Sequence, residues 1–168
     1  RFFLTTSDWP DLLDTAQKFR EMLGKIGIGV EIEAKPFAEL EASVLRPRNF
    51  QMLLFGHVYG YEPDPFAFWH SSQTKYPGLN ITGYAKKDAD LLLEEVRRNI
   101  DPAARQEILK EFSLLILKDM PVLFLFRQHY PYMLPSFIKG ASPSKFGLPS
   151  VRFNTVDEWN IKIKRVLK

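Results

Sequence analysis

The first 55 residues alternate between two hydrophobic periods, and this alternation restricts the fold more than any other feature of the sequence. Three segments have the composition or the alternation of strands: 1–4, 28–34 and 50–55. Between them, apolar residues recur at helical spacing in a helix that Ser7 can cap and Gly24 can end, and in a short helix that Pro47 ends. The order strand, helix, strand, helix, strand predicts an α/β fold in which helices flank a sheet.

The second half of the chain is predicted to contain two helices and one apolar strand. Asp101 is a favourable N-cap and Pro102 suits the first position of a helix, so one helix ends and another begins at this pair. Pro121 then opens an apolar segment, 122–126, with the composition of a strand. After Lys139 the composition changes to Gly, Ala, Ser and Pro, which makes the tail from residue 141 a candidate for another lobe.

The composition restricts the classes of function. A chain of 168 residues is long enough for one domain with a substantial core. No apolar run approaches the roughly 20 residues that cross a bilayer. The net charge of +3 is spread along the chain, so nucleic acid is not an expected partner. Because there is no cysteine, disulfides, thiolate metal sites and a cysteine nucleophile are excluded.

The sequence contains no recognisable arrangement for catalysis. His57, His70 and His129 lack a histidine partner at i+2 or i+4, so each is expected in a loop or at the surface. The pair Gly27 and Gly29 lies between a helix and a strand, the reverse of a phosphate-binding helix start, and no Gly-x-Ser-x-Gly motif is present. We therefore predict no enzyme activity, no cofactor, and no catalytic or metal-binding residue.

The segment 56–84 is predicted to be a long loop with one helical turn near 66–69. It begins directly after the predicted strand 50–55. Ligands of open α/β sheets lie outside the carboxyl ends of the strands, where glycine admits close approach and aromatic rings offer stacking surface. The predicted ligand-binding residues are therefore Gly56, His57, Val58, Tyr59, Gly60 and Tyr61. The simpler interpretation is that these rings seal the loop onto the sheet.

Several motifs in a fixed order carry a family resemblance across nearly the whole chain. They are "FFLTTSDWPDLLDTAQKFREMLGKIGIGVEIEAKPFAELEASV", then "FQMLLFG" leading to "EPDPFAFWHSS", then "NITGYAKKDADLLLEEVRRNIDPAARQEILKEFSLLILKDMPVLFLFR", and finally "RFNTVDEWNIK". With these motifs the chain resembles the family 5 extracellular solute-binding proteins of bacterial ABC importers, the peptide and nickel receptors. The resemblance implies a periplasmic binding protein-like lobe, with a mixed sheet flanked by helices.

The resemblance also implies a domain organisation and partners. Residues 1–140 correspond to the second lobe of a two-lobe receptor, and residues 141–168 to the C-terminal segment that returns to the first lobe. The rest of the first lobe and the signal sequence are not in this chain. Such a receptor captures an oligopeptide or a similar small solute in the cleft between the lobes and delivers it to an ABC permease in the membrane. It works at the periplasmic or extracellular face of the membrane, with a lipid anchor as one option.

The binding loop departs from the peptide receptors of the family at two positions. Gly56 matches the glycine that begins their ligand-facing loop, but His57 stands where tryptophan is usual. Gly60, or a neighbouring tyrosine, matches the aspartate that anchors the amino terminus of a peptide ligand, so this charge-assisted contact is lost. An oligosaccharide receptor of the same family is therefore an alternative. The ligand-sensing domain of a transcription regulator is another, because the same kind of lobe occurs there.

Overall fold

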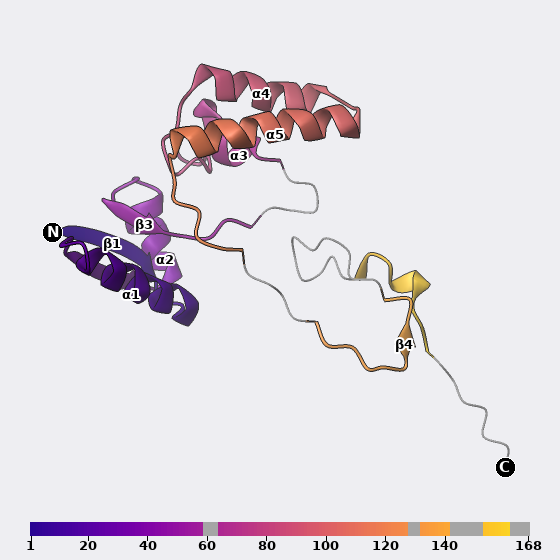
Figure 1. Cartoon of the computed structure of the whole chain (residues 1–168), viewed down its shortest axis with the longest axis horizontal. Helices are drawn as coiled ribbons and strands as arrows, with labels where there is room; N and C mark the ends of the chain where they lie inside the picture. The colour runs from indigo at the N-terminus through magenta and orange to yellow at the C-terminus, as the bar shows by residue number, and fades with distance from the viewer. Residues whose placement is uncertain (59–63, 128–131, 142–152, 162–168) are drawn as a thin grey trace, which may run out of the picture. The chain divides into compact units, whose positions relative to one another are not determined.

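The computed structural model describes residues 1–58, 64–127, 132–141 and 153–161 (Figure 1). The chain forms two compact units. The first unit comprises Arg1–His57 and Pro65–Pro121, and the second comprises Val58–Asp64 and Val122–Lys168. The first unit contains the parallel sheet and the long helices.

Three parallel strands form the sheet of the first unit. Strand β1 (Phe2–Ser7) lies between β2 (Val30–Lys35) and β3 (Met52–Leu54). Phe2 pairs with Val30 at one end of β1 and Ser7 with Lys35 at the other, while Leu4 pairs with Met52. The predicted α/β class, with helices flanking a sheet, is confirmed. The antiparallel strands that the structure describes belong to the second unit.

Helix α1 (Pro10–Gly24) covers the sheet and forms the first core cluster with it. Ala16, which is fully buried, packs with Leu4 of β1 and Val30 of β2. The partly buried residues that pack against this cluster are Phe19, Leu23, Ile28, Ile32, Met52 and Leu54. Because the apolar residues of α1 recur at helical spacing, one face of the helix supplies all of its contribution to the core. The predicted end of the helix at Gly24 is confirmed.

The predicted helix cap at Ser7 is wrong. Ser7 is the last residue of β1 and its side chain is buried, whereas α1 begins at Pro10 and no side chain among the described residues caps it. The strand continues past its apolar residues because polar side chains find partners in the sheet. Thr6 Oγ1, for example, donates to the carbonyl oxygen of Leu54 at 3.0 Å. Pairing with distant strands therefore decides where β1 ends, and the local sequence pattern does not reveal it.

A second core cluster is built from α2 (Phe37–Leu40) and the π-helical turn Glu41–Leu45. It contains Leu40, Val44 and Leu45, against which Phe50, Leu53, Phe55 and Ile81 pack. The short helix predicted before Pro47 is confirmed as these two consecutive turns. Strand β3 is shorter than the predicted strand over 50–55, and its side chains are half-buried rather than fully covered.

Helices α4 (Lys87–Arg98) and α5 (Pro102–Asp119) lie side by side (Figure 1). Their buried side chains are Ala89, Leu93, Val96, Phe112 and Ile116. Trp69 of α3 (Phe66–Trp69) meets the ring of Phe112 nearly edge to face, with centroids 6.3 Å apart. The two helices predicted around the Asp-Pro pair are confirmed. No helix in the described part of the chain is long and apolar enough to cross a membrane.

The end of α5 is tied to the segment that enters α4. Lys86 Nζ and Tyr84 Oη both donate hydrogen bonds to Asp119 Oδ2, at 2.8 and 2.7 Å. These two hydrogen bonds, that from Lys86 first, lower the pKa of the Asp119 carboxyl. The stabilisation they supply is present above the ordinary carboxyl pKa and is lost as the pH falls through the lowered value.

The N-cap of α5 gives a first test of the fold. Asp101 accepts a hydrogen bond from the backbone N–H of Ala103 at 3.1 Å, and Pro102 occupies the first helical position, as predicted. We expect Asp101→Ala to lower the free energy of unfolding by about 1 kcal/mol, because a helix N–H loses its acceptor. Urea denaturation followed by circular dichroism measures this. Asp101→Asn keeps a capping oxygen and should lose much less, and equal losses would contradict the capping role.

In the second unit, the predicted strand over 122–126 is wrong. This segment pairs with no strand in the part of the chain that the structure describes, and Leu123, Phe124 and Phe126 are exposed. Strand formation needs a partner, which apolar composition alone does not supply. The strands of this unit are instead two short ones, β4 (Ile138–Lys139) and β5 (Asn160–Ile161), paired antiparallel. The lobe boundary at residues 140 and 141 stays a prediction.

Candidate ligand-binding site

Three of the six predicted ligand-binding residues lie in the described part of the chain. Gly56, His57 and Val58 follow β3 and are exposed, as expected for a loop at the carboxyl end of a strand. Tyr59, Gly60 and Tyr61 lie outside the described residues. The binding role of all six stays a prediction.

Five ring side chains form a row that begins at the carboxyl ends of the three parallel strands. This aromatic row consists of Trp9, Phe37, Phe55, His57 and Phe68, and its successive ring centroids are 6.5, 6.5, 6.1 and 4.6 Å apart. Trp9 follows β1, Phe37 follows β2, and Phe55 and His57 follow β3. Phe68 comes from α3 and completes the row against His57. Because carboxyl ends of parallel strands meet at one edge, residues far apart in sequence converge there.

The row offers accessible ring surface at the edge where open α/β sheets bind ligands. Trp9 is 61% exposed and Phe37 is 46% exposed, whereas Phe55 and Phe68 are half-buried. The half-buried ring of Phe55 packs between the exposed rings of Phe37 and His57. Aromatic rings of this kind can stack on planar groups, on apolar side chains or on the apolar faces of sugars, and the imidazole adds polar atoms.

Of the six predicted ligand-binding residues, only His57 belongs to the row. Trp9 and Phe37 are not among the predicted ligand-binding residues. A usable signal was present, because Trp9 and Phe37 each stand two residues beyond the last residue of a parallel strand. The end of β1 was placed too early, however, so the common position of the two rings was missed.

The rings around His57 change its protonation. Although the imidazole is accessible in part, burial against its neighbours, which include Phe55 and Phe68, lowers the pKa of His57 below its usual value of 6.5. The side chain is therefore neutral at pH 7, with one ring nitrogen able to donate and the other able to accept a hydrogen bond. An uncharged imidazole suits a ligand group that is itself neutral.

The lowered pKa of His57 predicts a pH dependence of stability. Below about pH 6.5 the unfolded chain binds a proton at His57 more readily than the folded chain, so the free energy of unfolding falls as the pH falls. The contribution is complete above the unfolded pKa and is lost on the acid side. The thermal midpoint should fall as the pH is lowered from about 7.5 to about 5.5. We expect this fall to be smaller in His57→Phe than in the wild type. Equal drops would contradict the burial effect.

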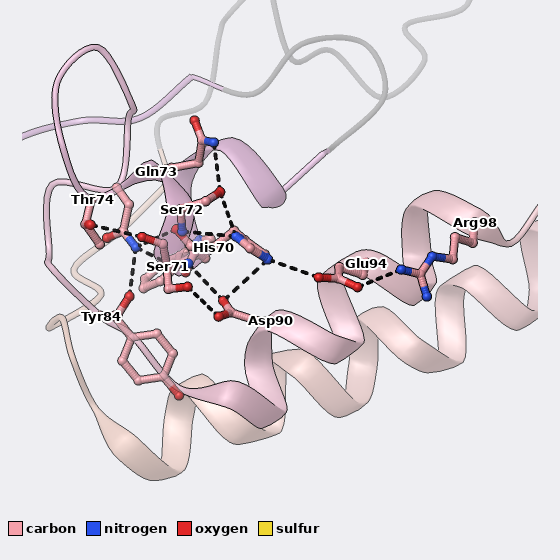
Figure 2. Close-up of polar contacts among 11 residues, drawn as sticks. His70, Ser71, Ser72, Gln73, Thr74, Tyr84, Asp90, Glu94 and Arg98 are labelled. Atoms are coloured by element: carbon pink, nitrogen blue, oxygen red, sulfur yellow. Dashed lines mark hydrogen bonds and ion pairs between the residues drawn. The ribbon is translucent and has the colours of Figure 1, made fainter.

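His70 lies in a loop directly after α3, which is one of its two predicted locations, and not at the surface. It is buried, and its ring stacks on the ring of Phe66, with centroids 4.0 Å apart. The backbone N–H of Ser72 donates to its Nδ1 at 3.1 Å, and its Nε2 faces carboxylate oxygens of Asp90 and Glu94 at 3.8 and 3.6 Å (Figure 2). This network joins the end of α3 to α4. No three potential metal ligands gather within the described ranges of the chain, and His129 lies outside them.

Comparison with known proteins identifies the fold. Neither a scan against protein-family models nor a search of curated proteins gives a match. Among solved structures, the oligopeptide-binding protein AppA from Bacillus subtilis, in complex with a nonapeptide, is 25% identical, with a TM-score of 0.70 over 96% of this chain and 32% of its own. The chain has the fold of a solute-binding protein.

Two further solved structures share this solute-binding fold. NikZ from Campylobacter jejuni, in complex with Ni(L-His), is 21% identical, with a TM-score of 0.66 over 94% of this chain and 32% of its own. The ABC transporter-associated periplasmic binding protein DppA from Helicobacter pylori, in complex with the peptide STSA, is 24% identical, with a TM-score of 0.61 over 71% of this chain and 24% of its own. All three neighbours are binding proteins rather than enzymes. The resemblance to family 5 solute-binding proteins is thereby confirmed.

The chain spans about a third of the length of AppA and NikZ. A site built within it therefore corresponds to only part of the surface that those longer proteins can offer a ligand. The aromatic row lies entirely within the first compact unit, so its geometry is complete in this chain.

Proposed function

We propose that this chain is part of the substrate-binding component of an ABC import system. Residues 1–140 form the second lobe of a two-lobe receptor, and residues 141–168 return to the first lobe. The receptor captures an oligopeptide or a similar small solute in the cleft between the lobes and delivers it to a membrane permease. It catalyses no reaction, and nucleic acid is not among its partners.

One observation carries this proposal. The aromatic row begins where three parallel strands end, in a chain whose fold matches that of AppA, a protein solved with a nonapeptide. Accessible rings on a stiff sheet edge give a ligand apolar contact area at little cost in side-chain entropy. A receptor needs such a preorganised surface and no nucleophile.

The location of the receptor follows from the same proposal. DppA from Helicobacter pylori is a periplasmic protein associated with an ABC transporter. We place the present receptor likewise at the periplasmic or extracellular face of the cell membrane, with a signal sequence outside these 168 residues and a lipid anchor as one means of attachment.

A second candidate is an oligosaccharide receptor of the same fold. It is favoured by the lack of the aspartate that the peptide receptors of the family carry for the peptide amino terminus, since Gly60 or a neighbouring tyrosine matches that position. Without that carboxylate, an ammonium group loses a charge-assisted hydrogen bond, while the rings of the aromatic row suit the apolar face of a sugar.

Thermal stabilisation of the whole receptor distinguishes the candidates. A ligand that binds only the folded state raises the free energy of unfolding, by about 2.7 kcal/mol at 100 times its Kd. Matched panels of short peptides, oligosaccharides and histidine-chelated nickel would be compared. We expect the peptide panel to raise the midpoint. A response to sugars alone would favour the second candidate, and a response to chelated nickel alone would overturn both.

The 168-residue chain provides the control. Since the second wall of the cleft belongs to the missing lobe, isothermal titration of the chain alone with the same peptides should show weak binding or none. Tight binding to the chain alone would contradict the interlobe cleft.

A further inference from the structure

Helix α3 brings Phe68 to the aromatic row, yet it is a single helical turn. The ring centroids of Phe68 and His57 are 4.6 Å apart. The next residue, Trp69, is buried, and its ring packs edge to face on Tyr84 at 6.4 Å and on Phe112 at 6.3 Å. One turn of helix cannot hold its own orientation, because helix nucleation is unfavourable. Contacts from outside α3 must therefore fix where Phe68 points.

Asn80 supplies the polar part of those contacts. Its side chain is fully buried, and its Nδ2 lies 3.1 Å from the carbonyl oxygen of Trp69, 3.2 Å from that of His70 and 2.8 Å from that of Tyr84. Three carbonyl oxygens around one atom identify that atom as the amide nitrogen, a donor. Thr82 Oγ1 donates to Asn80 Oδ1 at 2.8 Å. This hydrogen bond favours the same orientation of the amide, with its oxygen toward Thr82 and its nitrogen toward the three carbonyl oxygens. One amide thus satisfies carbonyl groups at the end of α3 and at the entrance to α4.

A second set of hydrogen bonds holds Ser71, which follows His70 in the chain. The backbone N–H and the hydroxyl of Ser71 donate to the two carboxylate oxygens of Asp90, at 2.8 and 2.5 Å (Figure 2). Asp90 belongs to α4, so it anchors the chain just after α3 to a long, stable helix. Asn80 binds the carbonyl oxygen of Trp69, the last residue of α3, whereas Asp90 binds Ser71, two residues after α3.

We propose that Asn80 is a positioning residue for the aromatic row: its buried amide holds the end of α3 and thereby sets the ring of Phe68 against His57. The inference rests on the proposed function insofar as the row is the ligand site. The juxtaposition of the two rings is nevertheless measurable without any ligand, because both lie in the first compact unit of this chain.

Asn80→Asp tests the proposal with almost no change in side-chain size. A carboxylate cannot donate and a protonated carboxyl donates only one hydrogen bond, so the three carbonyl oxygens lose donors in a buried site, and the end of α3 should move. The readout is the NMR signal of the His57 ring in the 168-residue chain. We expect its ring-current shift from Phe68 to decrease and its pKa to rise toward the usual value of about 6.5, since burial of the imidazole is reduced. Phe68→Leu marks the signal expected when the ring is absent.

Two controls keep the test decisive. Asn49→Asp makes the same chemical change at an exposed position and should leave the His57 signal unchanged. Thr82→Val removes the hydroxyl that orients the Asn80 amide and adds no charge. If Asn80→Asp does not fold, the His57 signal of Thr82→Val tests the positioning role instead. An unchanged His57 signal in a folded Asn80→Asp chain, or in Thr82→Val when Asn80→Asp is unfolded, overturns the proposal.

The role in binding is measured separately, in the whole receptor with the ligand that stabilises it. Asn80→Asp should weaken affinity by about the same factor as Phe68→Leu. A moved His57 signal with unchanged affinity in both variants would leave the positioning role intact and refute the ligand site. An unmoved signal would refute the positioning role whatever the affinity.

Discussion

Replacing Trp69 by alanine is expected to lower the free energy of unfolding by about 3–5 kcal/mol. The indole is 5% exposed and meets Phe112 of α5 and Tyr84 of the segment before α4 nearly edge to face. Its removal leaves a cavity between α3, α5 and the segment before α4. Among the described residues, no other large side chain of α3 is buried as deeply. A domain of this size has a total stability of about 5–15 kcal/mol, so the loss is a large fraction of the whole. Urea denaturation followed by circular dichroism gives the value.

The same substitution at Trp9 is the matched control. Trp9 is 61% exposed, and its nearest ring in the row, Phe37, lies 6.5 Å away. A surface substitution of this kind changes stability by about 0.5 kcal/mol or less. Similar losses for Trp9→Ala and Trp69→Ala would contradict the prediction that the burial of Trp69 stabilises the fold.

Local signals in the sequence located most of the elements correctly. Helix α1 ends at Gly24 and α5 begins after Asp101, as predicted, because a helix is specified by its own periodicity and by residues at its ends. Non-local pairing caused the errors. β1 continues to Ser7 because β2 and β3 accept it as a partner, and the segment 122–126 fails to form a strand with any described residue, despite its composition.

The candidate site was predicted only in part, because its geometry also depends on non-local strand pairing. The rule that ligands lie beyond the carboxyl ends of strands located His57 correctly after β3. It did not find Trp9 and Phe37, because their approach to His57 depends on the strand order β2-β1-β3 and on the true end of β1. Asn80 carried no signal at all, since an asparagine in a loop is typical of a turn whether or not it is buried.

Removing both exposed rings of the aromatic row should nearly abolish ligand binding by the whole receptor. Truncation of an aromatic contact residue costs about 1–2 kcal/mol or more, which is about 5–30-fold in Kd for each ring. Trp9→Ala combined with Phe37→Ala should therefore weaken binding by at least about 30-fold, and because the two rings stack on each other their separate costs are not expected to add. Isothermal titration of the double variant with the stabilising ligand measures the change.

Stability must be measured on the same variants, because a destabilised receptor also binds less. Trp9 and Phe37 are both substantially exposed, at 61% and 46%, so the double variant should stay folded at the temperature of the titration. Ile100→Ala is the control, since Ile100 is 96% exposed between α4 and α5, outside the row. If the double variant is folded and binds as well as Ile100→Ala, the rings are only a cover for the sheet edge. If it is folded and binding is lost, the row contacts the ligand. Rings that only cover the sheet edge would lower the free energy of unfolding when removed and would leave the affinity unchanged.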